Sequence, residues 1–202
     1  MMGVGKAVLA TVAATVLLGA VVGSASARNF SISTQFLSAT FRRVTISTAF
    51  GNIICEIVAE GSFHRRTTAK RVGSLVGYVT SAAFGASGCE TGTATILRET
   101  LPWHIRYLGF AGTLPNISRI IANIVRSAVR VEPGAGIRCL GVGTEANPTI
   151  VTFNREVVTS VVTTATVGGT VPTDCSVNGT FSSDAAPIFL LGTTNRLTLT
   201  LI

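Results

Sequence analysis

Four cysteines carry the clearest chemistry in this 202-residue chain: Cys55, Cys89, Cys139 and Cys175. An even number of cysteines in an exported chain is typical of disulfide bonds. Four cysteines allow three connectivities, and the sequence alone does not select one of them. We expect Cys55–Cys89 and Cys139–Cys175, because each bond then closes a loop of about 35 residues without crossing the other.

Metal binding and nucleophilic catalysis have little support in the sequence. No two cysteines form a C-x2-C pair, and His64 and His104 stand at no ligand spacing, so zinc is not expected. The nearest match to a nucleophile elbow places Ser74 at the wrong position, and oxidised cysteines are not nucleophiles. We expect both histidines to be surface residues, and we expect no cofactor.

Glu99 and Trp103 form the grouping most similar to a sugar site, because an aromatic platform near a carboxylate suits a pyranose ring. Glycoside hydrolysis needs two carboxylates that face one cleft. The nine acidic residues of this chain are scattered singly and offer no evident second member. The alternative is that Trp103 anchors the core of a β-sheet protein.

The stretch from His64 to Arg71, called the basic segment below, is the only dense run of positive charge. Its cations are Arg65, Arg66, Lys70 and Arg71. Such a run could contact an acidic polymer of the cell envelope. It has no interleaved aromatic residues, so nucleic acid is not an expected partner. The alternative is an ordinary solvated loop.

The remaining residues favour strands, since Thr, Ser, Val, Ile and Gly dominate the chain after residue 27. Apolar residues alternate with polar ones, which is typical of strands with one face on a core. The runs that show this alternation are Phe30–Phe36, Ile53–Ala59, Trp103–Tyr107 and Leu197–Leu201.

Glycine-rich turn signals separate these runs at fairly regular intervals. We therefore predict an all-β fold, an antiparallel β-sandwich with a closed β-barrel as the alternative. The predicted turns are at residues 50–52, 85–88, 133–136, 168–169 and 178–179.

One segment fits two structures. The apolar residues of 117–130 follow helical spacing, with Asn116 as a candidate N-cap. Its many isoleucines and valines lose rotamer freedom in a helix and suit a strand. We predict a strand, with a single helix around 117–130 as the alternative.

The first 27 residues have the layout of a secretory signal peptide. Lys6 precedes an uncharged apolar stretch, and small residues follow up to Ala27. Cleavage near Ala27 would leave residues 28–202 as one secreted β-rich domain, located outside the cell or in the envelope. A retained N-terminal anchor is the alternative, although the apolar stretch is short for a membrane span.

A wider pattern supports export. The run Gly73–Tyr78 leads to Gly88-Cys89, then to Leu101-Pro102-Trp103, and a Leu114-Pro115-Asn116 turn follows. This arrangement resembles a group of small exported actinobacterial proteins with no assigned activity. The resemblance implies a secreted β-rich domain and carries over no catalytic or binding residue.

These observations favour an exported structural, surface or binding protein without catalysis. A secreted polysaccharide-active hydrolase that uses Glu99 is the first alternative. A small outer-membrane β-barrel is the second, because 175 residues could supply eight alternating strands. The four cysteines and the scarcity of aromatic residues count against it, so we expect no membrane contact once the signal peptide is removed.

Overall fold

The structure, a computed structural model, describes residues 29–113, 116–134, 136–155, 162–171, 173–175 and 179–201. The predicted signal peptide lies outside these ranges. The described residues form strands almost throughout. One 3-10 turn, η1 (Arg98–Thr100), is present among them. The strands are β1 (Asn29–Ile32), β2 (Phe36–Thr48), β3 (Gly51–Phe63), β4 (Thr67–Ala69), β5 (Leu75–Cys89), β6 (Thr93–Ile96), β7 (Trp103–Thr113), β8 (Asn116–Val125), β9 (Ala128–Gly134), β10 (Ile137–Val142), β11 (Thr149–Arg155), β12 (Val162–Val171), β13 (Gly179–Ser183), β14 (Ala186–Leu190) and β15 (Leu199–Leu201).

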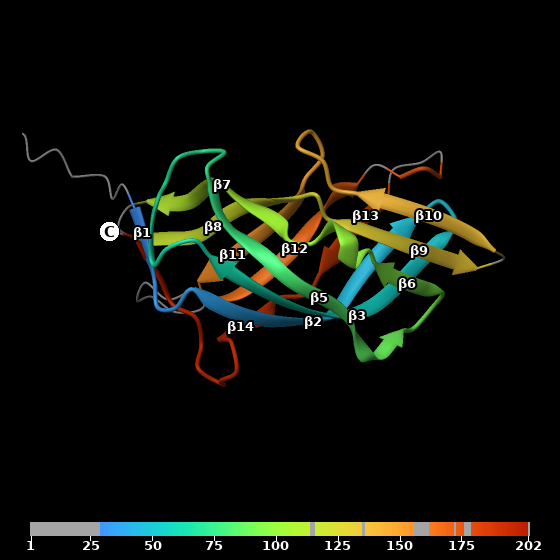
Figure 1. Cartoon of the computed structure of the whole chain (residues 1–202), viewed down its shortest axis with the longest axis horizontal. Helices are drawn as coiled ribbons and strands as arrows, with labels where there is room; N and C mark the ends of the chain where they lie inside the picture. Colours follow the sequence, from blue (N-terminus) through green and yellow to red (C-terminus); the bar gives the residue numbers. More distant parts are fainter. Residues whose placement is uncertain are drawn as a thin grey trace, which may run out of the picture.

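Nine strands form one antiparallel sheet whose pairings run in a ring (Figure 1). The order is β11-β8-β7-β5-β3-β2-β13-β12, and β11 pairs with β12 as well as with β8. β14 follows β13 along the chain and pairs with the same two neighbours, β2 and β12. Each wall of the ring therefore faces another wall of the same sheet across a shared interior.

Alternation along the strands explains why the interior is apolar. On β7, Trp103, Ile105 and Tyr107 are buried, whereas His104 and Arg106 between them are only half-buried. The inward residues of the other ring strands join them in one large core. The prediction of an all-β, antiparallel fold with buried alternating faces is confirmed.

Two three-stranded sheets lie at opposite ends of the ring (Figure 1). Sheet β15-β1-β4 places the buried side chains of Phe30, Ile32 and Leu199 in the large core. The Phe30 ring lies 6.2 Å from that of Tyr107, so this sheet closes its end of the ring. Sheet β10-β9-β6 lies at the other end, where a smaller cluster of buried residues includes two of the cysteines.

Both predicted disulfides are confirmed. Cys55–Cys89 joins β3 to its neighbour β5 at directly opposite positions. Cys139–Cys175 fastens the segment Thr173–Cys175 to β10, and the Asp174 carboxylate accepts a 2.7 Å hydrogen bond from the Leu140 N–H of the same strand. Both bonds therefore strengthen the end of the ring that carries β6, β9 and β10.

The segment from 116 to 134 is two strands, as predicted, and the alternative of a helix around 117–130 is wrong. β8 pairs with β7 on one side and with β11 on the other, so both sides of its backbone are used by ladder hydrogen bonds. Arg126, with a φ of 69°, breaks the run between β8 and β9. This angle is uncommon for a residue with a side chain.

Two predicted turns are wrong, because their glycines lie inside strands. Gly85 is within β5, where an added Cβ would collide with the Glu56 side chain of β3. Gly168 and Gly169 are within β12, where they allow close approach of the backbone carbonyls of Phe181 and Pro148. Glycine in a strand often marks such an approach instead of a turn.

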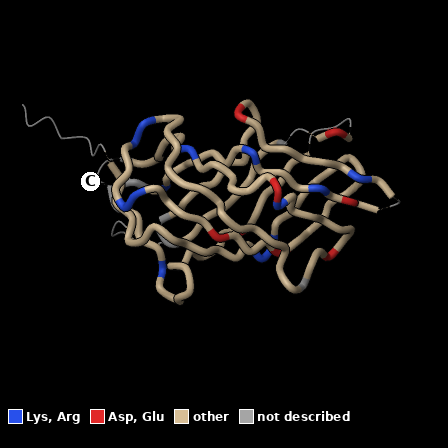
Figure 2. The backbone as a smooth tube through the Cα atoms, in the orientation of Figure 1, with Lys and Arg blue, Asp and Glu red and all other residues tan. Residues whose placement is uncertain are grey.

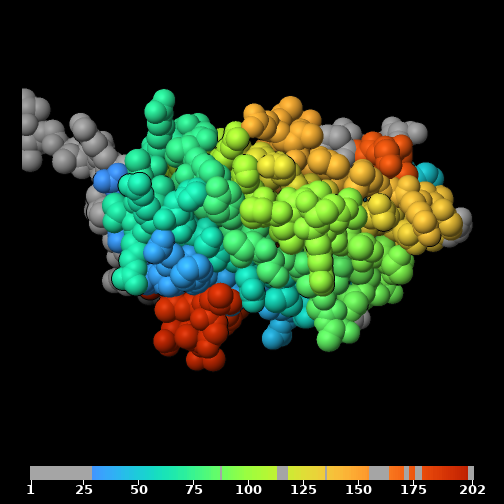
Figure 3. Space-filling model, in the orientation of Figure 1, coloured from blue at the N-terminus to red at the C-terminus, as the bar shows by residue number. Residues whose placement is uncertain are grey.

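The predicted continuity from Phe30 to Phe36 is also wrong. A bend at residues 33–35 separates β1 from β2, so the alternation does not carry across it. Phe36 is 58% exposed, and its carbonyl accepts a hydrogen bond from the Leu191 N–H. Figure 3 shows the C-terminal loop after β14 projecting beside β2.

We predict that replacing Cys139 and Cys175 by serine lowers the free energy of unfolding by about 3 kcal/mol, because the unfolded chain regains the freedom of a loop with a sequence separation of 36 residues. Urea denaturation of both proteins without reductant measures the change. An unchanged midpoint would show that this bond contributes little to stability.

Candidate functional site

An apolar cavity occupies the interior of the ring on the side of β6, β9 and β10. Its volume is about 130 Å³. Trp103, Ile124 and Val167 contribute to its walls together with smaller residues such as Ala59 and Ala82. No lysine, arginine or carboxylate belongs to the described residues that line it.

A second cavity of about 60 Å³ adjoins the first inside the ring. Five residues line both spaces, so they share a wall: Phe41, Ala59, Val79, Ile124 and Val167. The charged residue at the smaller cavity is Glu60, which alternation along β3 places on the face opposite Ala59. The two cavities therefore form an apolar interior that the side chains do not fill.

The size and lining of the larger cavity fit a small apolar ligand. Protein cores are normally packed to the density of organic crystals, and few voids exceed a water molecule. An engineered cavity of about 150 Å³ lined by apolar side chains stays dry and binds benzene. A space of about 130 Å³ lined mainly by apolar side chains is large enough for a molecule of similar size.

A pair of hydroxyl groups forms the one buried polar spot in the larger cavity. Ser127 and Thr149 are 8% and 4% exposed, and their hydroxyl oxygens lie 3.1 Å apart. Gly143 passes beside them, where an added Cβ would collide with the Ser127 hydroxyl. We call Ser127 and Thr149 the hydroxyl pair.

Three threonines stand at the outer part of the same cavity. Thr48 donates to the Gly51 carbonyl at 3.0 Å and accepts from the Phe50 N–H at 3.1 Å. The Thr173 hydroxyl accepts from the Cys175 N–H. Thr180 is exposed. The hydroxyls of Thr48 and Thr173 are therefore engaged by their own turns.

The structure separates Glu99 from the face of Trp103 that a sugar would need. Glu99 is exposed on η1, whereas Trp103 is 8% exposed and lines the larger cavity. The Trp103 indole N–H donates to the Thr100 hydroxyl at 2.8 Å, which fixes the ring with its apolar surface inward. Trp103 is a core residue, as the alternative interpretation predicted.

The two histidines lie on the outer surface, on either side of Tyr78. The ring centres of His64 and Tyr78 are 4.8 Å apart, and those of Tyr78 and His104 are 5.3 Å apart. Desolvation lowers the pKa of His104, and the positive charges of Arg126 and Arg106 add to the effect. Glu145 forms a 2.8 Å ion pair with Arg106.

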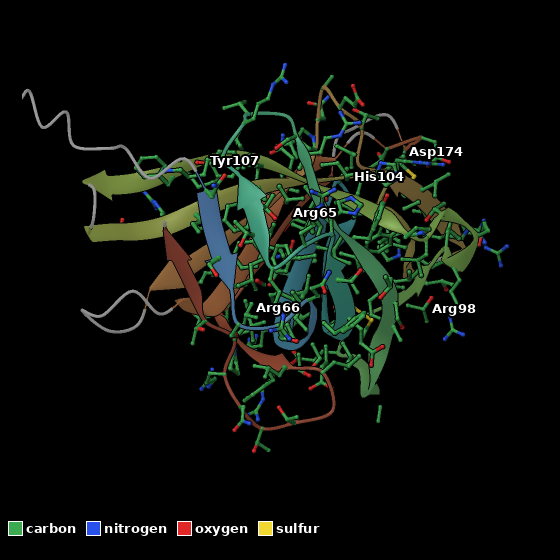
Figure 4. All side chains as sticks on the ribbon, turned by 60° about the vertical axis from the view of Figure 1, so that its left-hand side comes forward. Arg65, Arg66, Arg98, His104, Tyr107 and Asp174 are labelled. Atoms are coloured by element: carbon green, nitrogen blue, oxygen red, sulfur yellow. A yellow bond between two sulfur atoms is a disulfide. The ribbon has the colours of Figure 1, made fainter. Side chains whose placement is uncertain are left out.

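The basic segment does not form a single loop. β4 divides it into a bend at residues 64–66 and an irregular stretch at residues 70–71, and Arg65, Arg66 and Arg71 are exposed. Figure 4 shows Arg65 and Arg66 reaching different parts of the surface. The Lys70 ammonium lies 5.2 Å from the centre of the Phe110 ring, and burial lowers its pKa.

Charge elsewhere is dispersed. Figure 2 shows basic positions along the whole length of the molecule, whereas acidic positions lie in its middle and right-hand parts. The acidic envelope polymer therefore stays a prediction based on the basic segment. Ser74 does not form a nucleophile elbow, because its hydroxyl donates to the Arg71 carbonyl at 2.6 Å.

Within the described ranges, no three His, Cys, Asp or Glu side chains gather closely enough to hold a metal ion. Among the same residues, no helix is long and apolar enough to cross a membrane. Comparisons with protein-family models, curated proteins and solved structures found no match.

Sequence analysis missed the cavity. Its signal was the presence of small inward residues, Ala59 and Ala82, in otherwise bulky apolar strands. Such a signal is ambiguous, because a large residue on the opposite wall can fill the space that an alanine leaves. Ser127 also has no distinctive sequence signal, because it is a single polar residue between the two strands of an apolar segment.

We predict that Arg126→Gly raises the pKa of His104 toward its ordinary value of 6.5, because a neighbouring cation is removed. Glycine also tolerates the φ of 69°, so the fold should be retained. A pH titration of the histidine ring signals by NMR measures this, and Arg98→Ala, on exposed η1, is the control that should change nothing.

The same titration has a consequence for stability. Because the pKa of folded His104 lies below its value in the unfolded chain, the unfolded state binds more protons between the two values. The contribution of His104 to stability is therefore present above about pH 6.5 and is lost as the pH falls through the lowered pKa. Arg126→Gly should reduce this dependence, and an unchanged His104 signal would contradict the assignment.

Proposed function

We propose that this chain is an exported, non-catalytic binding protein that takes a small apolar molecule into the larger cavity. The observation that carries the proposal is a concave space of about 130 Å³ inside the ring whose lining is apolar except for a few hydroxyls. Ligand sites in proteins are typically concave and apolar, with a few polar groups that fix orientation.

The architecture supports the proposal. A closed ring of eight strands is just wide enough either to be filled by side chains or to hold one small ligand. Bulky residues, Phe30 and Phe63 among them, fill this ring on the side of β1 and β15. Smaller residues leave space on the side of β6, β9 and β10, where both disulfides stiffen the wall.

Export is part of the proposal. It is supported by the signal-peptide layout of residues 1–27 and by the resemblance to small exported actinobacterial proteins. The two disulfides are compatible with an extracellular protein. Location outside the cell or in the envelope would bring the cavity into contact with small apolar molecules of the surroundings.

The hydrolase alternative has no specific observation in its favour. It needs two carboxylates across one cleft. Glu99 is exposed, and no carboxylate other than that of Glu60 belongs to the described residues at either cavity. Undiminished turnover by Glu99→Gln would exclude that residue from any polysaccharide hydrolysis that the chain performs.

Benzene and hexane test the proposal directly. Trp103 is the single tryptophan of the chain and lines the larger cavity, so its emission reports on occupancy. We expect both compounds to change the Trp103 emission and to raise the Tm, since a ligand that binds only the folded state stabilises it.

Ala82→Leu provides the blocking variant. Ala82 is 3% exposed and lines the larger cavity, so a leucine there would occupy ligand space. We expect benzene affinity to fall at least about tenfold, with Tm retained because the new methyl groups fill a void. Ala69→Leu, at an exposed position on β4, is the matched control and should bind like the native chain. If neither benzene nor hexane changes the Tm or the Trp103 emission of the native chain, the proposal is refuted.

A further inference from the structure

Two hydroxyl groups carry two protons, and the hydroxyl pair uses only one of them internally. Either oxygen can be the donor in the 3.1 Å bond between Ser127 and Thr149. Among the described residues, this bond is the only side-chain hydrogen bond of either hydroxyl. Within the described part of the chain, the second proton therefore has no acceptor.

The second hydroxyl proton, which has no acceptor among the described residues, is energetically unfavourable, and a ligand could remove this penalty. Both residues are more than nine-tenths buried, so little of either side chain is in contact with bulk water. A buried donor without a partner is unfavourable, while satisfying it with an acceptor restores the lost hydrogen bond. Both residues line the larger cavity, so an acceptor atom of a ligand in that cavity could accept a hydrogen bond from one of the two hydroxyls.

From this proton count, and resting on the function proposed above, we propose that the ligand is a neutral molecule with one acceptor oxygen on an apolar body. Ketones, esters and ethers are the chemical class. The oxygen accepts a hydrogen bond from the hydroxyl pair, and the apolar body fills the space between Trp103 and Val167.

The rest of the lining argues against a charged ligand. A carboxylate that leaves water needs a cation or several donors to offset its desolvation. The described lining of the larger cavity contains no cation, and the smaller cavity adds only the negative Glu60. Fatty-acid carboxylates should therefore be rejected, although their chains would fit the apolar walls.

Three probes of equal chain length test the inference: hexane, hexan-2-one and hexanoate. The measured quantity is the ratio of the dissociation constants of hexan-2-one and hexane, obtained from Trp103 emission. We expect the double variant Ser127→Ala/Thr149→Val to shift this ratio about tenfold against the ketone, the effect of one lost hydrogen bond. Hexanoate should not bind at concentrations at which the ketone saturates the cavity.

The variants separate the hydroxyl pair from a general change in polarity. Each single variant leaves one hydroxyl with its proton free, so it should keep most of the ketone preference. Thr180→Val removes an exposed hydroxyl from the same cavity and should leave the ratio unchanged. The carbonyl stretch of bound hexan-2-one should lie at lower frequency in the native chain than in the double variant.

The possible failures are distinguishable. If the native chain binds neither hexane nor hexan-2-one, the proposed function itself is wrong. If hexane binds equally to the native chain and the double variant, the variant is folded and its cavity is intact. An unchanged ketone-to-hexane ratio in that variant, or hexanoate binding comparable to that of the ketone, would then overturn this inference alone.

Discussion

Pairing between β11 and β12 is the interaction on which the rest of the structure depends. Six register positions join Ile150–Arg155 to the partner strand and turn an open sheet into a ring. An open sheet would leave two rows of unpaired backbone groups, which are sites for aggregation. Closure satisfies those groups and also fixes the distance between opposite walls. The interior volume is therefore set by backbone geometry, and side chains only decide how much of it is filled.

Side chains fill the interior of the ring to different extents along its length, because the inward residues differ in size. Phe30, Phe63 and Phe153 approach one another in the half that β1 covers, with ring centres about 6.3 Å apart in successive pairs. In the other half, the inward positions of β3 and β5 include Ala59 and Ala82. The closed backbone cannot collapse onto these alanines, so space remains. Most of the unfilled space therefore lies toward β6, β9 and β10, while the smaller cavity extends as far as Phe153.

Local patterns predicted much of this fold. Alternation correctly identified the buried Leu197 and Leu199, and loop lengths favoured the cysteine pairs that the structure contains. The errors arose where local sequence is ambiguous. Glycine serves both turns and close strand contacts, so Gly85 was assigned to a turn although it faces Glu56. Ring closure and the hydroxyl pair depend on contacts between distant segments, which no local pattern encodes; Ser127 and Thr149 are 22 positions apart.

The arrangement of the two outermost strands determines how the molecule can be held. β1 and β15 are hydrogen-bonded neighbours, with Phe30 opposite Leu201, on the side of the ring away from β6, β9 and β10 (Figure 1). A tether joined to either strand would therefore pull on the same end of the molecule. Immobilised on a solid support in this way, the protein would present its cavity-bearing end to the solution. Because the pairing is antiparallel, force applied between Asn29 and Leu201 would separate the three register pairs one after another, beginning with Phe30 and Leu201, before it reached the ring.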